Sequence, residues 1–546
     1  MANVLLVSYA GYPYTPSSLC PDNGLGILAA VLREAGHHVR ILDYGTLATV
    51  RRLFPQELSQ RVAPLLQELS TSAAAQSGSS PLLLQELAKA DEALQQHQTR
   101  ELEAIADEVL RKVDDLEPAL VGFKLWNGDG FSGSVAIAER IRCRHPSLCL
   151  IAGGPHATWC GPYIYERTDV FDAVILGEAE QRIAELVACA VKGRPLDDLP
   201  GIVRSAQDRS VPSASMDLAE LPRAVYDEDV YPAMADDQKL KLIVLDDSRG
   251  CPYCCAFCTH PYESGQRLRT RPATRIVDDM EAYVCDYGVR AFRFAGSSTP
   301  GSLMAEVAQE ILRRGLDVAY TSFAHFSSSL PNHFEIMRRS GLRALFFGLE
   351  TGSEELLHRA TGKPLKLDEV VETVRAAKAA GIAVACSMIV PLPFETEETL
   401  EESLRLLLAL RPDSVPVQFP GLLPGSRWLE EPEAYGFEVD RDQYMRENMD
   451  YKIKLLFPPT FWKPLPYKLN GRSFDEFIKI TLGFAAKLEA NGLLTNVPDD
   501  NMLMAELTGM DYRAFRDGAR AWCALGLADA LQQFVSRFNS AASPSS

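Results

Sequence analysis

The chain has 546 residues, enough for two to four domains of ordinary size. Its hydrophobic fraction of 47% and charged fraction of 23% are typical of a globular protein. The net charge of −18 argues against nucleic acid as a partner, because phosphate binding needs a basic face. The sequence contains no apolar run of about eighteen residues, so no membrane span is expected.

Short apolar runs alternate with helical patterns over residues 1–195. The runs predict five strands, at Val4–Tyr9, Val39–Leu42, Leu120–Leu125, Leu148–Ala152 and Ala173–Leu176. Helices are predicted at Asn23–Gly36, Ser132–Arg144 and Glu180–Val191. This alternation predicts an α/β fold with a doubly wound, Rossmann- or flavodoxin-like parallel sheet, whose ligands bind at the C-terminal ends of the strands.

Glycine and aromatic residues stand where these strands end. The positions are the loop Ala10–Asp22, Trp126 and Asn127, the run Gly153, Gly154, Pro155 and His156, and the pair Gly177 and Glu178. Glycine lets the backbone approach a ligand closely, although each pair alone would also serve a tight turn.

Two segments depart from this pattern. Residues 51–117 form an insertion with a helical pattern at Leu82–Val113, which we expect to be packing decoration. The Ser-, Ala- and Gly-rich stretch Ser70–Pro81 within it is expected to be flexible. Residues 196–235 carry several prolines and predict a linker with one short hairpin around Gly201–Arg204.

A second strand–helix alternation fills residues 236–428. Its predicted strands are Leu242–Leu245, Ala291–Phe294, Val318–Phe323, Ala344–Gly348, Val384–Val390 and Ser414–Phe419. Helices such as Ala305–Arg314 and Leu367–Ala380 separate them. Six such units fit a partial (βα)6 barrel of the TIM type, whose active site would lie at the C-terminal face.

Residues 429–546 do not continue this alternation of strands and helices. Helical patterns at Phe474–Ala490 and Asp511–Phe538 predict a small, mostly helical C-terminal domain, and Ser540–Ser546 predicts a disordered tail. The aromatic and proline-rich stretch Phe457–Leu469 is a candidate lid or a packed connector.

Four of the twelve cysteines follow the first barrel strand: Cys251, Cys254, Cys255 and Cys258. Clustered thiols predict metal ligation. Structural zinc usually needs two ligand pairs, and no second Cys-x-x-Cys or His-x-His pair follows. An iron–sulfur cube uses thiolates, so three ligands from one loop suffice if the fourth iron binds a ligand that is not protein. A zinc knuckle or reactive thiols are the alternatives.

Cys251, Cys255 and Cys258 have the spacing Cys-x3-Cys-x2-Cys, with Phe257 before the last thiol. This pattern closely resembles the signature of radical S-adenosylmethionine (SAM) enzymes. The resemblance implies that these three thiolates hold a [4Fe–4S] cluster, whose fourth iron binds the amino and carboxylate groups of SAM. Cys254 is then a neighbour, not a ligand.

Two further stretches support the resemblance. Phe346–Ser353 is similar to the strand-four motif of the family, which implies that Glu350 lies close to bound SAM. Gly381–Val390, followed by the loop Pro391–Glu397, resembles the fifth strand of the family and its loop. The sequence departs from the family at Gly296, Ser297 and Ser298, which stand where cobalamin-dependent relatives often carry acidic residues. Backbone carbonyls or serine hydroxyls there would contact the amino group of SAM.

The N-terminal loops resemble the cobalamin-binding domain that precedes the radical domain in one large subgroup. Matching stretches are Asn23–His37, Gly153–His156 and Leu176–Glu178. The resemblance implies cobalamin contacts at Tyr12, Leu125, Trp126, Asn127, Gly153, Gly154, Pro155, His156, Gly177 and Glu178. The Asp-x-His-x-x-Gly motif is absent, which implies base-off cobalamin with no histidine below the cobalt.

We therefore expect a cobalamin-dependent radical SAM methyltransferase that acts on an unactivated carbon or phosphorus of a small metabolite or natural-product precursor. The alternatives are a ring rearrangement, cyclisation or heteroatom insertion with the same cofactors, and a non-catalytic cobalamin- or cluster-binding sensor. A general base, if needed, would be Tyr320, His325 or Glu395, each expected near the C-terminal end of a strand.

The expected partners are a small-molecule substrate and an external one-electron reductant of the flavodoxin or ferredoxin type, with no nucleic acid and no membrane. We expect a monomer. The scattered thiols and the cluster fit a reducing cytoplasm.

Overall fold

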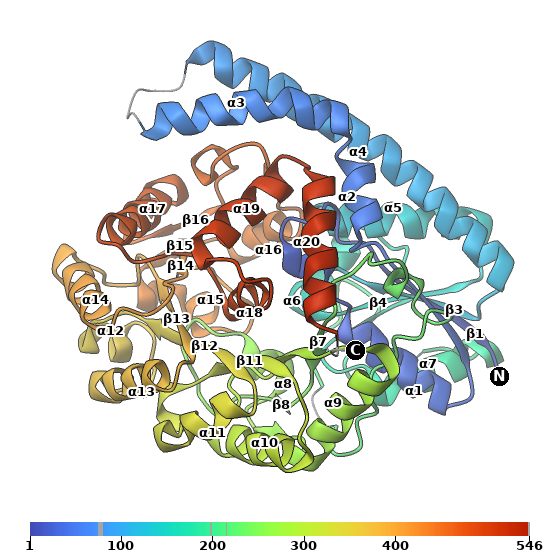
Figure 1. Cartoon of the computed structure of the whole chain (residues 1–546). Coiled ribbons are helices and arrows are strands. Elements are labelled where there is room, and N and C mark those ends of the chain that lie inside the picture. The colour runs from blue at the N-terminus through green and yellow to red at the C-terminus, as the bar shows by residue number, and fades with distance from the viewer. Residues whose placement is uncertain (75–79, 197–198, 214–215, 544–546) are drawn as a thin grey trace.

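The computed structural model describes residues 1–546 except 75–79, 197–198, 214–215 and 544–546. Two parallel sheets form its framework, one from the blue to green N-terminal third and one from the green to orange central part (Figure 1). Among the described helices, none combines the length and the apolar character that a membrane span needs.

The N-terminal sheet has the order β2-β1-β3-β4-β5-β6. Its strands are β1 (Asn3–Ser8), β2 (His38–Asp43), β3 (Leu120–Lys124), β4 (Cys149–Gly153), β5 (Ala173–Ile175) and β6 (Ile202–Val203). In β1, Val4 and Leu6 pack on one face while Leu5 and Val7 pack on the other, as expected of a strand covered on both sides. The first five strands are parallel, which confirms the predicted doubly wound sheet.

The predicted linker contributes to this sheet. Instead of a separate hairpin around Gly201, residues Ile202–Val203 form β6, which pairs antiparallel with β5. Sequence reasoning treated the proline-rich segment as a connector because a two-residue edge strand carries no detectable period.

Four helices frame the C-terminal edge of the sheet. They are α1 (Asn23–Glu34), α5 (Asp129–Arg144), α6 (Pro155–Cys160) and α7 (Glu180–Lys192). The sheet changes direction between β1 and β3, because the chain runs from β1 outward to β2 and then returns to the other side. Such a switch point is where open α/β sheets bind ligands.

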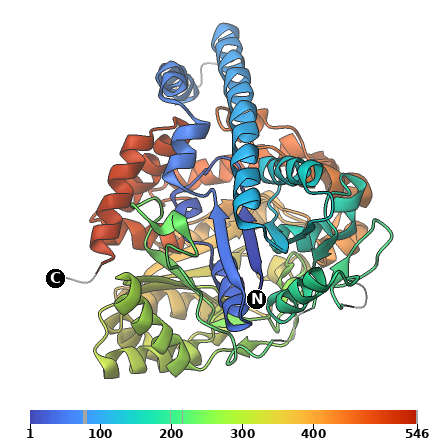
Figure 2. The same ribbon diagram turned by 90° about the vertical axis from the view of Figure 1, so that its right-hand side faces the viewer.

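The insertion is a helical hairpin. After α2 (Leu47–Leu53), helices α3 (Gln56–Ala74) and α4 (Pro81–Leu116) extend beyond the sheet, as Figures 1 and 2 show. The stretch predicted to be flexible is helical up to Ala74, and residues 75–79 lie outside the described part. Ile105, Val109 and Val113 anchor α4 in the same core as the face of the sheet that α5 covers.

The central sheet has the order β14-β13-β12-β11-β10-β7 and is entirely parallel. Its strands are β7 (Leu242–Leu245), β10 (Ala291–Phe294), β11 (Ala319–Ala324), β12 (Leu342–Glu350), β13 (Ala383–Ile389) and β14 (Val417–Gln418). Helices α9 (Ala273–Tyr287), α10 (Gly301–Arg314), α11 (Phe334–Arg339), α13 (Leu367–Ala379) and α14 (Glu397–Leu410) follow successive strands. Because β7 and β14 do not pair with each other, the barrel is partial, as predicted.

The C-terminal region is mostly helical but not entirely so. Strands β15 (Phe437–Val439), β16 (Tyr467–Leu469) and β17 (Arg472–Ser473) form a small antiparallel sheet that sequence reasoning missed. The helices are α16 (Arg441–Met449), α17 (Phe474–Ala490), α18 (Asp499–Leu507), α19 (Tyr512–Ala524) and α20 (Ala528–Ala541). The predicted helix Asp511–Phe538 is thus two helices, separated at Gly526. The predicted disordered tail is wrong for Ser540 and Ala541, which belong to α20.

Helix α18 covers the inner face of the partial barrel. Val497, just before α18, and Met502 pack against Ala344 and Ala385 of the sheet. At the start of the helix, the Asp499 carboxylate is fully buried. It accepts hydrogen bonds from Arg293 Nη2 at 3.0 Å and Thr321 Oγ1 at 2.8 Å.

The buried pair makes a stability prediction. Asp499→Ala removes the carboxylate that is hydrogen-bonded to Arg293 and leaves only Asp500, 4.0 Å away, and losing one member of a buried pair costs about 3 kcal/mol or more. Asp529→Ala is the matched control, because that carboxylate is 83% exposed and should change stability by less than about 0.5 kcal/mol. Urea unfolding measures both, and equal effects would show that α18 is not held through Asp499.

Candidate functional site

The cysteine loop leaves the C-terminal end of β7 and is fastened by backbone hydrogen bonds. The Cys251 N–H donates to Gly265 O at 3.1 Å, and the Ala256 N–H donates to Thr361 O at 2.7 Å. The Ala256 carbonyl in turn accepts from the Trp428 N–H at 3.0 Å. The loop is therefore shaped by segments that follow β12 and β14, not by the thiols alone.

The cysteine loop brings its thiols close enough to affect one another's pKa. Cys251 is buried, Cys255 and Cys258 are partly buried, and Cys254 is exposed. Burial raises the pKa of Cys255 to about 11 and that of Cys258 to about 12, and the neighbouring thiols add to both shifts. In the described part of the chain, no three His, Cys, Asp or Glu side chains converge on a single ion. A [4Fe–4S] cluster binds each thiolate at a different iron atom, so the three thiols need not converge on one point. The three thiols therefore fit such a cluster.

Glu350 lies beside these thiols at the end of β12. Its backbone has a φ of 69°, a strained conformation for a residue with a side chain, and the pairing with β13 shifts register there. Its carboxylate is 3.0 Å from the Lys363 ammonium, which also donates to Gly348 O. Burial disfavours the charge of Lys363, but Glu350 and Cys255 raise its pKa. Sequence reasoning missed Lys363, whose one signal was its place after the helix that follows strand four.

Asp247 organises the loop after β10. Its fully buried carboxylate accepts hydrogen bonds from the Gly296 N–H at 2.7 Å, Ser248 Oγ at 2.7 Å and Thr299 Oγ1 at 2.8 Å. A Cβ on Gly296 would lie 2.1 Å from Ser248 Oγ, so this position requires glycine. Burial raises the pKa of Asp247 to about 6, and the three donors oppose that shift.

The remaining predicted SAM and cluster contacts lie in the same region. The Ser297 hydroxyl lies close enough to the Cys251 thiol to oppose the rise of its pKa on burial, and the next residue, Ser298, is buried. Phe257 packs against Trp428, with the ring centroids 5.7 Å apart. The structure therefore brings Ser297 to the cluster loop and places Phe257 in the packing behind it.

Two of the three candidate bases are committed elsewhere. Tyr320 is fully buried between the sheet and its helices, and its hydroxyl lies 2.8 Å from Ser340 Oγ. It therefore lies away from the rim, because alternate residues of a strand face opposite sides. Glu395 accepts from the Leu392 N–H at 3.1 Å and Thr399 Oγ1 at 2.5 Å, so both of its oxygens shape the loop after β13.

His325 lies at the site but is a hydrogen-bond donor, not a base. Its ring stacks on Tyr253 of the cysteine loop at 4.0 Å. The Ser327 N–H donates to His325 Nδ1 at 3.2 Å, so the neutral ring carries its proton on Nε2. Burial and Lys363 lower the pKa of His325 to about 3. The buried Nε2 has no partner in the described part of the chain.

A wide cavity of about 660 Å³ lies at the C-terminal edge of the N-terminal sheet. Four of the predicted cobalamin contacts line it, namely Tyr12, Trp126, Asn127 and His156. The Asn127 N–H donates to His156 Nδ1 at 2.8 Å, so this ring also carries its proton on Nε2. Burial and Lys124 lower the pKa of His156 to about 4. The Tyr12 hydroxyl is committed to Cys523 O at 2.9 Å, which leaves its ring to form the wall.

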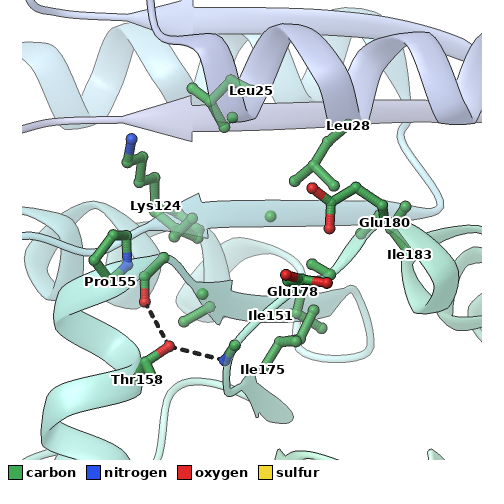
Figure 3. Close-up of a pocket in the computed structure, with 18 of the residues that line it drawn as sticks. Leu25, Leu28, Lys124, Ile151, Pro155, Thr158, Ile175, Glu178, Glu180 and Ile183 are labelled. Carbon is green, nitrogen blue, oxygen red and sulfur yellow. Dashed lines mark hydrogen bonds between the residues drawn. The ribbon is translucent and has the colours of Figure 1, made fainter. Parts of the chain in front are cut away.

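A narrower slot of about 270 Å³ lies between the sheet and helices α1 and α7 (Figure 3). Its apolar walls include Leu25, Leu28, Ile151, Ile175 and Ile183. Gly122 lies on its floor, where a Cβ would come within 3.0 Å of Leu6 Cδ2. An apolar slot opened by a glycine in the middle of a strand suits a flat ring system.

The other predicted cobalamin contacts line or support this slot. Gly153, Gly154, Pro155, Gly177 and Glu178 line it, and Leu125 is buried behind it. Thr158 Oγ1 donates to Gly154 O at 3.1 Å and accepts from the Gly177 N–H at 2.9 Å, which fastens two of its loops (Figure 3). Glu178 accepts two hydrogen bonds from Arg269 of the central domain, at 2.9 and 2.5 Å. Its carboxylate therefore joins the domains.

Comparison with known proteins agrees with this geometry. Residues 246–407 match the Radical SAM superfamily model. An uncharacterized methyltransferase of Pyrococcus horikoshii is 24% identical over 357 residues, which cover 62% of this chain and 75% of that protein. The anaerobic magnesium-protoporphyrin IX monomethyl ester cyclase of Rubrivivax gelatinosus is 25% identical over 56% of this chain and 57% of its own length.

Among solved structures, the radical SAM methyltransferase TsrM of Kitasatospora setae, with cobalamin and a [4Fe–4S] cluster bound, superposes with a TM-score of 0.62. It is 17% identical, and the match covers 98% of this chain and 99% of that one. The fold is therefore shared over the whole length. Residues 246–407 thus match the radical SAM superfamily, as the cysteine motif predicted, and the whole chain shares the fold of TsrM.

Proposed function

We propose that the protein is a cobalamin-dependent radical SAM methyltransferase that methylates an unactivated carbon or phosphorus of a small molecule. The observation that supports this proposal most strongly is the direct contact between the thiol loop and the wall of the wide cavity. The Trp159 ring packs at a tilt against His156 of the cavity wall, with the ring centroids 4.7 Å apart, and its indole N–H donates a hydrogen bond to Glu263, in the short helix that follows Cys258. The two candidate cofactor sites thus share one wall.

In this proposal Cys251, Cys255 and Cys258 hold a [4Fe–4S] cluster, and SAM binds beside it. Bound cluster, SAM and cobalamin would supply the one-electron and methyl-group chemistry, while the protein orients them and excludes water. Lys363 and the His325 Nε2–H are buried donors near these thiols, so they suit the carboxylate of SAM.

Cobalamin would occupy both cavities of the N-terminal domain. The wide cavity suits the corrin ring and the narrow slot suits the planar nucleotide base. A base held in the slot is unable to bind cobalt. His156 is also excluded as a cobalt ligand in this geometry, because Nδ1 already accepts a hydrogen bond and Nε2 carries the proton. This supports base-off cobalamin without a histidine ligand.

The cyclase relative favours one other candidate function, a radical reaction with the same cofactors that transfers no methyl group. The external one-electron reductant, the monomeric state, the absence of a nucleic-acid partner and the cytoplasmic location stay predictions. The domain boundaries at 195, 235 and 428 likewise belong to the proposal.

Incubation of the reduced, cluster- and cobalamin-loaded protein with methyl-deuterated SAM tests the function. A methyltransferase should form S-adenosylhomocysteine and place deuterated methyl groups on an acceptor, both measurable by mass spectrometry. A deuterium-free product alongside 5′-deoxyadenosine would indicate the non-methylating reaction. Formation of neither nucleoside by protein with an intact cluster would leave a non-catalytic sensor.

The choice of cluster ligands predicts opposite results at two adjacent cysteines. Cys255→Ala should lose most of the iron bound after anaerobic reconstitution, because two thiolates do not hold the cluster. Cys254→Ala should keep it, because this thiol is exposed and outside the triad. Iron and sulfide assays with the absorption spectrum measure both. Loss of iron from Cys254→Ala with retention in Cys255→Ala would contradict the assignment.

The Lys363–Glu350 pair predicts that one pair of variants changes protein stability and SAM affinity independently. Lys363→Met should weaken SAM binding about tenfold and also destabilise the fold, because Glu350 is left buried without its partner. The double variant Lys363→Met with Glu350→Gln should recover the melting temperature but not the affinity. Lys366→Met, at an exposed neighbour, is the control.

Equilibrium dialysis of SAM against cluster-loaded protein and thermal unfolding give the two readouts. Recovery of both properties in the double variant would mean that Lys363 serves only to neutralise Glu350.

A further inference from the structure

We infer that Lys124 binds the phosphate of the nucleotide arm of cobalamin and thereby selects complete cobalamin over corrinoids that lack this arm. The inference rests on the proposed cobalamin function and adds a residue to it. It starts from the relation between the two cavities of the N-terminal domain.

The wide cavity and the narrow slot meet at one place. Of the residues that line them, two belong to both, Gly24 and Lys124. Gly24 has no side chain, and the nearest atom to a Cβ built there would be Asp22 Oδ1 at 3.5 Å, so the junction is open. Figure 3 shows Lys124 at one end of the slot, with Glu178 and Glu180 toward the other.

The connectivity of cobalamin requires an anion at this junction. A phosphodiester links the corrin side chain to the ribose that carries the base. If the ring occupies the wide cavity and the base occupies the slot, this linker passes between the two. Lys124 is the cation that both cavities share, and an ammonium is a good phosphate partner.

The contacts of Lys124 hold its ammonium at the junction. Its Nζ lies 2.5 Å from Asp22 Oδ2 and 4.7 Å from the centroid of the Trp126 ring. Asp22 is in turn fixed, because its other oxygen accepts from the Leu25 N–H at 3.1 Å. An ammonium has three N–H donors, and that of Lys124 uses one of them for Asp22 in the described part of the chain. The other donors can bind a phosphate oxygen.

The arginines at the other end of the slot are already neutralised. Arg249 Nη2 lies 2.8 Å from Glu180 and its Nε 2.8 Å from Asp246, while Arg269 forms two hydrogen bonds with Glu178. These acidic partners disfavour a phosphate at that end. Lys124 is also paired, with Asp22, but the other end carries three carboxylates, Glu178, Glu180 and Asp246, for its two arginines. Charge and connectivity therefore both favour the Lys124 end.

Three corrinoids separate the parts of the ligand. Cobinamide ends before the phosphate, cobinamide phosphate ends at it, and hydroxocobalamin carries the whole arm. Binding to the cofactor-free full chain is followed by absorption and ultrafiltration, without any turnover. The wild-type protein should bind cobinamide phosphate and hydroxocobalamin about tenfold or more tightly than cobinamide.

Lys124→Met should remove that advantage, weakening hydroxocobalamin and cobinamide phosphate about tenfold while leaving cobinamide unchanged. Lys124→Arg should keep most of it. Lys452→Met is the matched control, because Lys452 lines a neighbouring cavity and also pairs with an aspartate, Asp129, at 2.7 Å. It should leave all three affinities unchanged.

If Lys124→Met folds poorly because Asp22 is left unpaired, the double variant Asp22→Asn with Lys124→Met removes both charges and should show the same selective loss. An equal loss for all three corrinoids, or a loss for hydroxocobalamin alone, would overturn the phosphate assignment while leaving cobalamin binding intact. Failure of the wild-type protein to bind any of them would overturn the cobalamin proposal as well.

Discussion

A buried arginine two residues before the first cluster cysteine holds the two halves of the molecule together. The Arg249 guanidinium contacts Asp246 of its own loop and Glu180 of the N-terminal domain, each at 2.8 Å. Burial disfavours its charge, but these carboxylates raise its pKa. A buried network of this kind contributes little net stability compared with a hydrophobic contact. Its consequence is geometric, because it fixes the thiol loop against the wall of the narrow slot.

Burial has different effects on the groups around that loop. Charge survives where a partner is supplied, as in the Lys363–Glu350 pair, and is suppressed where none is, as in His325. The rim thus carries donors in two forms, an ammonium and a neutral imidazole N–H. Both would act through hydrogen bonds to a ligand.

Sequence patterns were sufficient for the features that depend on local order. Parallel strands buried on both faces give continuous apolar runs, so both sheets could be predicted, with ends displaced by a few residues. The triad Cys251, Cys255 and Cys258 was predicted from the four thiols of the loop through the resemblance of its spacing to the radical SAM signature, and this choice of ligands stays a prediction. The Gly153–His156 run was predicted to contact a ligand because it lies at the C-terminal edge of the sheet and resembles the matching loop of cobalamin-binding domains.

The features that sequence reasoning missed depend on contacts between distant segments. Asp247 is one of 73 acidic residues in the chain, and only its burial against Gly296 and Thr299 distinguishes it. The Asp499–Arg293 pair joins residues about two hundred positions apart, so no local period reveals that α18 enters the barrel. Tyr320 failed as a candidate base because it is the second residue of β11, far from the C-terminal end of that strand, and its buried side chain faces the helices.

The account depends on two cofactor sites in one chain, joined through Arg249 and the Trp159–Glu263 contact. Metal analysis of protein reconstituted anaerobically with iron, sulfide and hydroxocobalamin tests this most directly. The predicted result is about four iron atoms and about one cobalt atom per chain, with the absorption of both groups present together. Four iron atoms without cobalt would keep the radical SAM domain but contradict the assignment of the N-terminal cavities.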